Sequence, residues 1–388
     1  MTLSALRTHF PHTEHTVYVN HAATSPLSQP VMDAMDRYFK ERHGARPGDP
    51  IDNFERFMPV IAEARDRAAR LLGTHPDRLA FMPNTSAALN ILAEGLDWQP
   101  GDRIAVPACE FPTNVYPFLN LERRGVTVDF IPDEEGTFTL DALEAALTPD
   151  TRLLTLSWVQ FLSGFMVDLR AVGALCEAHD VLFCVDAIQG LGALEIDVEA
   201  AGIDFLAAGG HKWLMATQGI GLLYCAERLQ ERLHAPAGWL HGPVDWENLS
   251  AYDLEFHPEA RRYEIGTRNN AGIAALHAAL ELHLEAGPSW CEQQVRARAQ
   301  QLADGFDALG LPRYGPRDPA HRAGIVTIRV DNPEALFDHL RAQGITAALR
   351  NRLVRFAPTY YNTSEDMDAV LAAVDAFVEG EKRITARA

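Results

Sequence analysis

The sequence predicts an α/β protein with a mostly parallel central sheet, helices on both faces of that sheet, and a smaller C-terminal α+β domain. Two observations support this prediction. Between residues 77 and 225, short apolar runs alternate with amphipathic segments, and such repeated strand–helix units form mostly parallel sheets that are covered on both faces. After Glu227 the alternation ends, and a loop rich in Gly, Pro and Trp leads into long helical segments.

Signals for individual elements follow in order along the chain. Residues 1–18 form an N-terminal arm, a helix begins near Gln29, and helical periodicity over 59–72 stops at Gly73. The apolar runs predicted as strands of the sheet are residues 79–82, 104–106, 126–131, 153–159, 181–185, 203–208 and 219–225. The helices predicted between them are residues 87–96, 113–123, 140–147 and 168–179. We assign residues 19–270 to this large domain.

The remaining residues, 1–18 and 271–388, are assigned to the small domain. Its expected helices are residues 271–286, 289–309, 333–343 and 365–378, and its expected strands are residues 325–330 and 354–356. Because these helices and strands do not alternate in regular units, they are typical of an α+β arrangement.

Composition and charge exclude several classes of function. The chain has 388 residues and a formal net charge of −19, which argues against nucleic acids and anionic membranes as partners. No apolar run approaches the roughly 20 residues that span a bilayer, and the lack of a signal-peptide core favours a cytoplasmic location. The five cysteines are scattered, so neither disulfides nor a metal site is expected. No G-x-G-x-x-G motif follows an early strand, which disfavours a nicotinamide-dependent dehydrogenase.

One lysine, Lys212, follows a predicted strand closely. Between the apolar run 203–208 and this lysine lie Gly209 and Gly210, which end the strand and let the backbone pass close to a bulky group. A lysine on such a turn can form a Schiff base if its amine is kept neutral. For this residue taken by itself, a solvated loop lysine is the alternative interpretation.

Asp186 directly follows the strand predicted at residues 181–185. A carboxylate at the end of a buried strand needs a cationic or hydrogen-bonded partner. A protonated pyridine nitrogen is one such partner, and a helix-capping role is the alternative. Gln189 lies three residues later, at a spacing that could direct its amide to the same ligand.

Three other segments allow both a functional and a structural interpretation. Thr85 and Ser86 begin a helix, where free N–H groups favour a phosphate, although an ordinary N-cap would need the same residue types. Phe111 could lie flat against a heteroaromatic ring or be part of the core. Arg355 stands between two apolar neighbours, and it either binds a ligand or lies on the surface of an edge strand.

Together these segments resemble the class V aminotransferases of the fold-type I pyridoxal-phosphate (PLP) enzymes, a family that also includes cysteine desulfurases, kynureninases and isopenicillin-N-epimerase-like proteins. The segments that carry the resemblance are, in order, Asn20-His21-Ala22-Ala23, Asn84-Thr85-Ser86, Phe111-Pro112-Thr113-Asn114, Val185-Asp186-Ala187-Ile188-Gln189, Gly209-Gly210-His211-Lys212-Trp213, Glu264-Ile265-Gly266-Thr267, and Arg355 with Tyr361-Asn362-Thr363. They extend over nearly the whole chain. The resemblance implies a fold-type I architecture and pyridoxal 5'-phosphate as the cofactor.

The resemblance also implies a role for each matching residue. Lys212 would carry PLP as a Schiff base and move the Cα proton of the substrate, while Asp186 would keep the pyridine nitrogen protonated. Arg355 would bind the substrate α-carboxylate as a bidentate fork, and His21 would either lie beside the substrate or cap and pack. The other implied cofactor contacts are Thr85, Ser86 and His211 at the phosphate, Gln189 at the ring hydroxyl, Phe111 stacked on the ring, Asn114 and Gln160 beside it, and Thr267 from the partner subunit of a homodimer.

The sequence departs from the desulfurases that it resembles at one functional point. Those proteins carry a nucleophilic cysteine on a mobile loop before the carboxylate-binding arginine, whereas residues 344–352 contain no cysteine. We therefore expect a transaminase or a β-eliminating (C–S) lyase that acts on a small amino acid through a Cα carbanion, and not a persulfide-forming cysteine desulfurase. An epimerase of the isopenicillin-N-epimerase-like type, or a catalytically inactive PLP-fold binding module, is the alternative.

Overall fold

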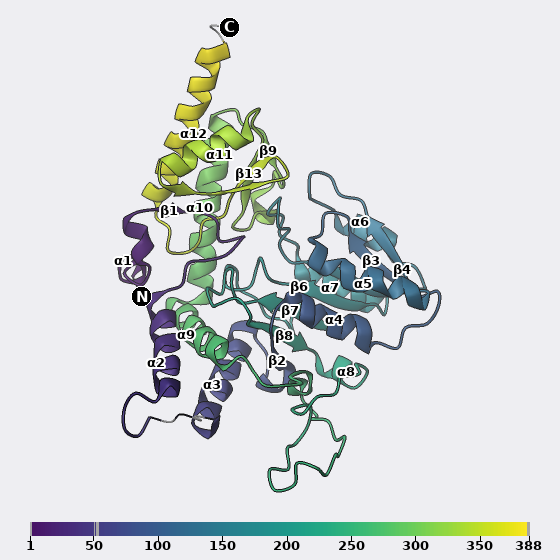
Figure 1. Ribbon diagram of the computed structural model, residues 1–388. Helices are drawn as coiled ribbons and strands as arrows, with labels where there is room; N and C mark the ends of the chain where they lie inside the picture. The colour runs from purple at the N-terminus through teal and green to yellow at the C-terminus, as the bar shows by residue number, and fades with distance from the viewer. Residues whose placement is uncertain (1, 50, 52–53, 386–388) are drawn as a thin grey trace.

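A seven-stranded sheet forms the centre of the protein (Figure 1). The structure, a computed structural model, describes residues 2–49, 51 and 54–385. The strands of the sheet lie in the order β2-β8-β7-β6-β5-β3-β4. Their bounds are β2 Leu79–Met82, β3 Arg103–Pro107, β4 Thr127–Ile131, β5 Thr151–Ser157, β6 Leu182–Asp186, β7 Phe205–Gly209 and β8 Gly221–Cys225. Within this sheet only β8 runs antiparallel to its neighbours, so the mostly parallel sheet predicted from the sequence is confirmed.

Helices cover both faces of this sheet because its strands are apolar on both sides. Along β6, Phe183 and Val185 belong to the core on one face, while Cys184 belongs to the core on the other. The first face is covered by α3 (Phe54–Leu72), α7 (Leu169–Ala178) and α9 (Asn270–Ala286), and the second by α4 (Thr85–Gly95) and α5 (Tyr116–Leu119). The α2 helix (Gln29–His43) packs beside α9, and α6 (Leu140–Ala146) lies beyond β4.

A second, smaller sheet lies in the C-terminal part of the chain. It is antiparallel, with the order β12-β13-β10-β9, and a parallel pair of β1 and β11 lies nearby. The bounds are β1 Val17–Tyr18, β9 Arg313–Tyr314, β10 Val326–Ile328, β11 Ile345–Thr346, β12 Ala348–Arg350 and β13 Leu353–Phe356. The helices α10 (Pro288–Ala308), α11 (Pro333–Ala342) and α12 (Ser364–Thr385) share an apolar core with this sheet. The remaining helices, α1 (Leu3–Arg7) and α8 (Glu227–Gln230), are short.

The two sheets are connected by the long helix α10, which continues from α9 toward the smaller sheet (Figure 1). Because α9 contributes Ile273 and Leu280 to the core of the large sheet, this helix pair packs against both parts of the protein. The domain boundary at residue 270 stays a prediction. Among the described residues, no helix is long and apolar enough to cross a membrane.

One predicted helix is wrong as a continuous element. Residues 113–123 form the 3-10 turn Pro112–Asn114, the single helical turn α5 and a second 3-10 turn, Asn120–Arg124. Proline lacks the N–H group that a helix interior requires, and Pro117 lies in the middle of this segment. The break matters for the site, because it places the residues after β3 in a turn at the end of the sheet.

Candidate active site

Neighbouring parallel strands at the centre of the sheet end at one edge, and the site lies there. Asp186 is the last residue of β6, it pairs with Ser157 of β5, and it lies opposite Ala207 of β7. Lys212 follows the end of β7 by three residues. Ligands bind beyond the carboxyl ends of strands in such sheets, so the fold alone brings the segments of Asp186 and Lys212 to the same edge.

A cavity of about 340 Å³ opens at this edge and contains Lys212. It joins segments from seven parts of the sequence. Its lining is formed by Ala22, Ala23, Asn84, Thr85, Ser86, Phe111, Thr113, Phe161, Ile188, Gln189, His211, Lys212, Arg350 and Arg355. Seven of the residues singled out from the sequence therefore meet at one place, namely Thr85, Ser86, Phe111, Gln189, His211, Lys212 and Arg355.

The Asp186 carboxyl group is buried, and only one of its two oxygens accepts a hydrogen bond. Its Oδ1 accepts a hydrogen bond of 3.0 Å from the backbone N–H of Ile188, and its Oδ2 has no hydrogen-bond partner among the described residues. Burial raises the pKa of Asp186, and the nearby Glu110 carboxylate adds to this shift, while Lys212 opposes it. A cationic hydrogen-bond donor at Oδ2 would relieve both the missing bond and the desolvation.

The surroundings of the Lys212 amine favour its neutral form more than water does. Burial lowers its pKa, and the charges of Arg355 and Arg350 lower it further, against the opposing effect of Asp186. Its Nζ lies 5.7 Å from the centre of the Phe111 ring. A neutral amine is the form that attacks a carbonyl, so this environment suits Schiff-base formation. The Phe111 ring is 42% exposed and meets Phe161 edge to face, at 5.2 Å between centroids.

The start of α4 is suited to an anion. Asn84 caps the helix by accepting a hydrogen bond of 2.8 Å from the N–H of Ala87, which leaves the earlier N–H groups without an intrahelical partner. The Thr85 hydroxyl is buried and has no hydrogen-bond partner, and the Ser86 hydroxyl lies 3.1 Å from that of Thr113. Burial, and then Lys212, lower the pKa of His211, which also lines this cavity.

Arg355 is the most deeply buried cation of the site, with 2% of its surface exposed. One of its terminal nitrogens donates to the backbone carbonyl of Phe161, and its Nε has no hydrogen-bond partner. Burial lowers the pKa of this guanidinium to about 10, and Arg350 contributes to the shift. A buried, incompletely bonded guanidinium is suited to a carboxylate.

Two predicted residues lie at or near the cavity with their polar groups already engaged. The Gln189 amide donates to the backbone carbonyl of Ala22 at 3.0 Å and accepts from the Trp213 indole at 2.9 Å, which leaves one N–H for a ligand. His21 is fully buried and does not line the cavity. Its ring nitrogens lie 2.7 Å from the Ser25 hydroxyl and 3.1 Å from the Tyr361 hydroxyl, in the packing arrangement that the sequence left open.

Asn114 and Gln160 are not part of the cavity wall either. Both donate hydrogen bonds to the buried Glu110 carboxylate, at 3.1 and 2.6 Å. Ser157 donates to the same carboxylate through its backbone N–H and its hydroxyl. Ser157 pairs with Asp186 across β5 and β6. Glu110 is therefore a second buried acid near the end of the strand that carries Asp186. Sequence reasoning missed this network, because the two segments 110–114 and 157–160 meet only in the folded chain.

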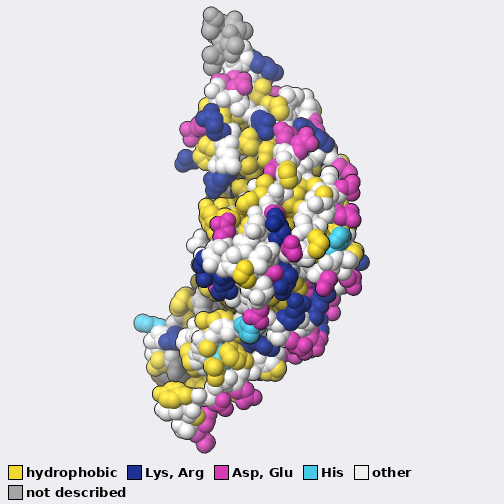
Figure 2. All heavy atoms as spheres, turned by 90° about the vertical axis from the view of Figure 1, so that its right-hand side faces the viewer, with side chains coloured by type: hydrophobic (Ala, Val, Ile, Leu, Met, Phe, Trp, Pro, Cys, Tyr) yellow, Lys and Arg dark blue, Asp and Glu magenta, His cyan; other side chains and the backbone are white. Residues whose placement is uncertain are grey.

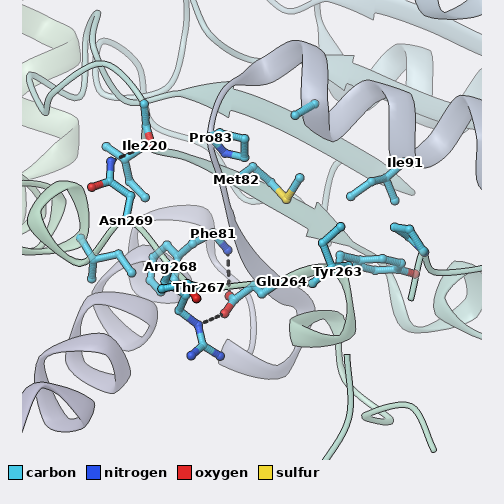
Figure 3. Close-up of a pocket in the computed structure, with 16 residues that line it drawn as sticks. Phe81, Met82, Pro83, Ile91, Ile220, Tyr263, Glu264, Thr267, Arg268 and Asn269 are labelled. Carbon is cyan, nitrogen blue, oxygen red and sulfur yellow. Dashed lines mark hydrogen bonds and ion pairs between the residues drawn. The ribbon is translucent and has the colours of Figure 1, made fainter. Parts of the chain in front are cut away.

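Thr267 lies away from Lys212, on the rim of another pocket (Figure 3). This pocket is lined mainly by apolar side chains, among them Met82 and Ile220. Beneath Thr267, the buried Glu264 carboxylate is held by Arg65, by Arg268 and by the backbone N–H of Phe81. Within this chain, the structure therefore places Thr267 at a surface and outside the cavity that contains Lys212.

Comparisons with known proteins agree with this geometry. The sequence profile of the family described as Aminotransferase class-V matches residues 17–370. A probable cysteine desulfurase of Methanothermobacter thermautotrophicus is 31% identical over 95% of this chain and 96% of its own length. The chain belongs to the class-V aminotransferase family.

Solved structures of class-V enzymes share its architecture. The apo structure of a cysteine desulfurase from Thermococcus onnurineus NA1 superposes with a TM-score of 0.87 at 25% identity, and covers 97% of this chain and 98% of its own. The cystine C–S lyase C-DES, in complex with cysteine persulfide, gives a TM-score of 0.86 at 25% identity, over 94% of this chain and 99% of its own. The fold-type I architecture predicted from the sequence is confirmed.

Pyridoxal phosphate is the cofactor of this class-V enzyme, and the residues present fit it. Three buried polar atoms without a hydrogen-bond partner, Thr85 Oγ1, Asp186 Oδ2 and Arg355 Nε, belong to the residues at this strand edge. Their chemistry matches a phosphate, a protonated ring nitrogen and a substrate carboxylate respectively. Buried polar groups are normally hydrogen-bonded, so a bound ligand that supplies these three partners fits the site.

Proposed function

We propose that this PLP-dependent enzyme is a lyase that acts on a small amino acid and releases a sulfur-bearing β-substituent directly, without forming a protein persulfide. The observation that carries the proposal is that none of the residues lining the Lys212 cavity is a cysteine. In place of a mobile loop, β12 and β13 are joined by only Asn351 and Arg352. A two-residue turn is too short to carry a nucleophile into the cavity and back.

The state of the cysteines supports this proposal. Burial raises the pKa of all five thiols, Cys109, Cys176, Cys184, Cys225 and Cys291. Because the thiolate is the nucleophilic form of cysteine, none of these side chains is activated for attack on a substrate sulfur. The similarity to the cystine C–S lyase points in the same direction.

In the proposed reaction, each side chain of the site has a separate role. Bound PLP withdraws electrons from the substrate Cα and makes its proton acidic. Arg355 holds the α-carboxylate, Lys212 removes the Cα proton, and the β-substituent departs with the electrons of the C–S bond. Asp186 would hold a proton on the ring nitrogen of PLP, while Thr85, Ser86 and His211 would hold its phosphate. Water then completes the reaction, which yields pyruvate, ammonium and a thiol.

A product assay tests this proposal. The purified holoenzyme is incubated with a panel of amino acids that includes thioether derivatives of cysteine. Pyruvate and a free thiol are expected, and Lys212→Ala should abolish both products and the visible absorption band of bound PLP. A keto acid formed together with an aminated cofactor would instead identify a transaminase. The mirror-image amino acid would identify an epimerase, and persulfide on a protein cysteine would identify a desulfurase.

We further propose that the enzyme is a homodimer with shared active sites. Thr267 lies at the pocket shown in Figure 3. Ile265 lines the same pocket and is 40% exposed although it is apolar. Threonine from a partner subunit could complete the phosphate site at α4, since Thr267 does not reach the Lys212 cavity of its own chain.

A further inference from the structure

A second arginine, Arg350, lines the cavity together with Arg355. The resemblance to the family implies a role for Arg355 only. Arg350 lies in the segment 344–352, which contains no cysteine. Arg350 is the last residue of β12 and is exposed, whereas Arg355 is buried in β13. The site therefore offers one guanidinium at its base and one at its mouth.

The register of the β12–β13 hairpin fixes this arrangement. Ala348 pairs with Arg355, and Arg350 pairs with Leu353. Side chains alternate between the faces of a strand, so Arg350 lies on the same face as Ala348 and hence on the same face as Arg355. Diagonal neighbours of this kind lie about 7–8 Å apart and are within reach of long side chains. The turn residues Asn351 and Arg352 both have positive φ, as a tight two-residue hairpin requires.

No acidic side chain in the described part of the chain neutralises this pair at the cavity. The lining contains no Asp or Glu. The guanidinium of Arg350 donates to its neighbouring backbone carbonyl, that of Leu349, at 2.8 Å, and forms no ion pair with a described residue. By contrast, Arg352 does not line the cavity and pairs with Glu334 at 3.3 Å. Two positive charges on one face, one of them buried, favour a ligand that places a negative charge at each of them.

We infer that the substrate of this site is an α-amino acid with a second carboxylate on its side chain, which Arg350 binds while Arg355 binds the α-carboxylate. The inference rests on the proposed function and names the substrate class for it. For a lyase that breaks a C–S bond, the second carboxylate belongs to the sulfur substituent. Arg350 is then the residue that determines specificity, because it is the cation at the open end of the cavity.

A matched pair of thioethers tests this inference on the holoenzyme. S-carboxymethyl-L-cysteine and S-carbamoylmethyl-L-cysteine have the same shape and the same C–S bond, but only the first carries a distal negative charge. We expect kcat/KM to be ~10-fold higher for the acid, the order of a charge-assisted hydrogen bond at a partly exposed site. Arg350→Gln should remove most of this preference, by lowering kcat/KM for the acid much more than for the amide. High salt should also reduce it.

Arg352→Gln is the control, since it removes a neighbouring positive charge that lies outside the cavity lining and is paired with Glu334, and it should preserve the preference. A second readout needs no turnover: glutarate should bind the holoenzyme more tightly than its monoamide by calorimetry, and Arg350→Gln should abolish the difference. Equal treatment of acid and amide by the wild type would overturn the inference. So would an equal loss for both in Arg350→Gln, or the same loss in Arg352→Gln. If glutarate binding shows the preference but no pyruvate forms from either thioether, the substrate class stands and the lyase reaction fails.

Discussion

Asp186 combines a buried carboxyl group with one oxygen that has no hydrogen-bond partner. Because its pKa in the folded protein is raised to about 7, it binds a proton more tightly there than in the unfolded chain. Its contribution to stability is therefore complete at low pH and is lost as the pH rises through about 7. Above that range, the apoprotein carries an uncompensated buried charge until a cation lies at Oδ2.

Asp186→Asn should consequently stabilise the apoprotein at pH 8 and weaken PLP binding. We expect the gain in the free energy of unfolding to be about 2 kcal/mol larger at pH 8 than at pH 5, because the carboxyl group of the folded wild type is ionised at pH 8 and protonated at pH 5. Thermal unfolding of apoprotein at both pH values measures this. Asp204→Asn is the control, because Asp204 is equally buried but is paired with Arg228 and with the backbone N–H of Phe183. That variant should lose stability. A loss at pH 8 for Asp186→Asn would contradict the argument.

At the level of single residues, sequence alone identified the groups that follow strand ends. Lys212 and Asp186 could be found because an apolar run followed by a charged residue is visible in one dimension. Arg350 could not, because its position depends on the register of a hairpin that the sequence does not specify. Glu110 was missed for a related reason, since its partners Ser157 and Gln160 come from another strand end. Pairings between distant loops leave no local pattern.

At the level of elements, the start of α4 determines how tightly the cofactor phosphate is held. Thr85→Val keeps the shape of the side chain and removes a buried hydroxyl that has no hydrogen-bond partner. The free energy of unfolding of the apoprotein should therefore stay the same or rise slightly. The affinity for PLP should fall by ~10-fold, the value of a hydrogen bond to a charged group. Pyridoxal without its phosphate is the control ligand, and its dissociation constant, measured by absorbance, should not change. Equal weakening of both ligands would exclude a phosphate contact.

The β12–β13 hairpin contains local backbone strain. Asn351 and Arg352 have φ values of 48° and 59°, a region that costs a residue with a side chain about 1 kcal/mol or more. The free energy of unfolding should therefore be about 1 kcal/mol higher for Arg352→Gly than for Arg352→Ala. Both variants lose the exposed ion pair with Glu334, and only glycine relieves the strain. Chemical denaturation of the two variants compares them directly. If alanine proved as stable as glycine, the turn would not be strained.

For the molecule as a whole, the sequence predicted the parallel sheet and its helical cover, because apolar runs on both faces of a strand require helices on both sides. It did not predict the broken segment around α5, where Pro117 overrides the helical periodicity, or the short strands β9, β11 and β12. Strands of two or three residues carry too few side chains to show a period of two. Figure 2 shows acidic and basic side chains interspersed over one face of the molecule. Because the net charge of the chain is negative, an anionic cofactor is bound through local hydrogen-bond donors and not through the overall charge.

Shared active sites would be a property of the whole assembly, and mixing two variants detects them. In Lys212→Ala the Schiff-base lysine is missing but Thr267 is intact. In Thr267→Glu the lysine is intact but a negative charge replaces the proposed phosphate contact, so each variant alone should form little or no PLP–lysine linkage. In a mixed dimer, the Thr267→Glu subunit has its own Lys212 and receives Thr267 from its partner, which restores one complete site.

After the two variants are unfolded together and refolded in equal amounts, random pairing should restore roughly a quarter of the wild-type absorbance of lysine-bound PLP. Sedimentation of each separate variant shows whether it still forms a dimer, and mixing Lys212→Ala with Asp186→Asn is the control. Asp186 lies beside Lys212 in the same chain, so that mixed dimer should gain nothing beyond the absorbance of the Asp186→Asn subunits themselves. If Thr267 acted within its own chain, the first mixture would show no recovery either, and a monomer with full PLP binding would contradict the dimer itself.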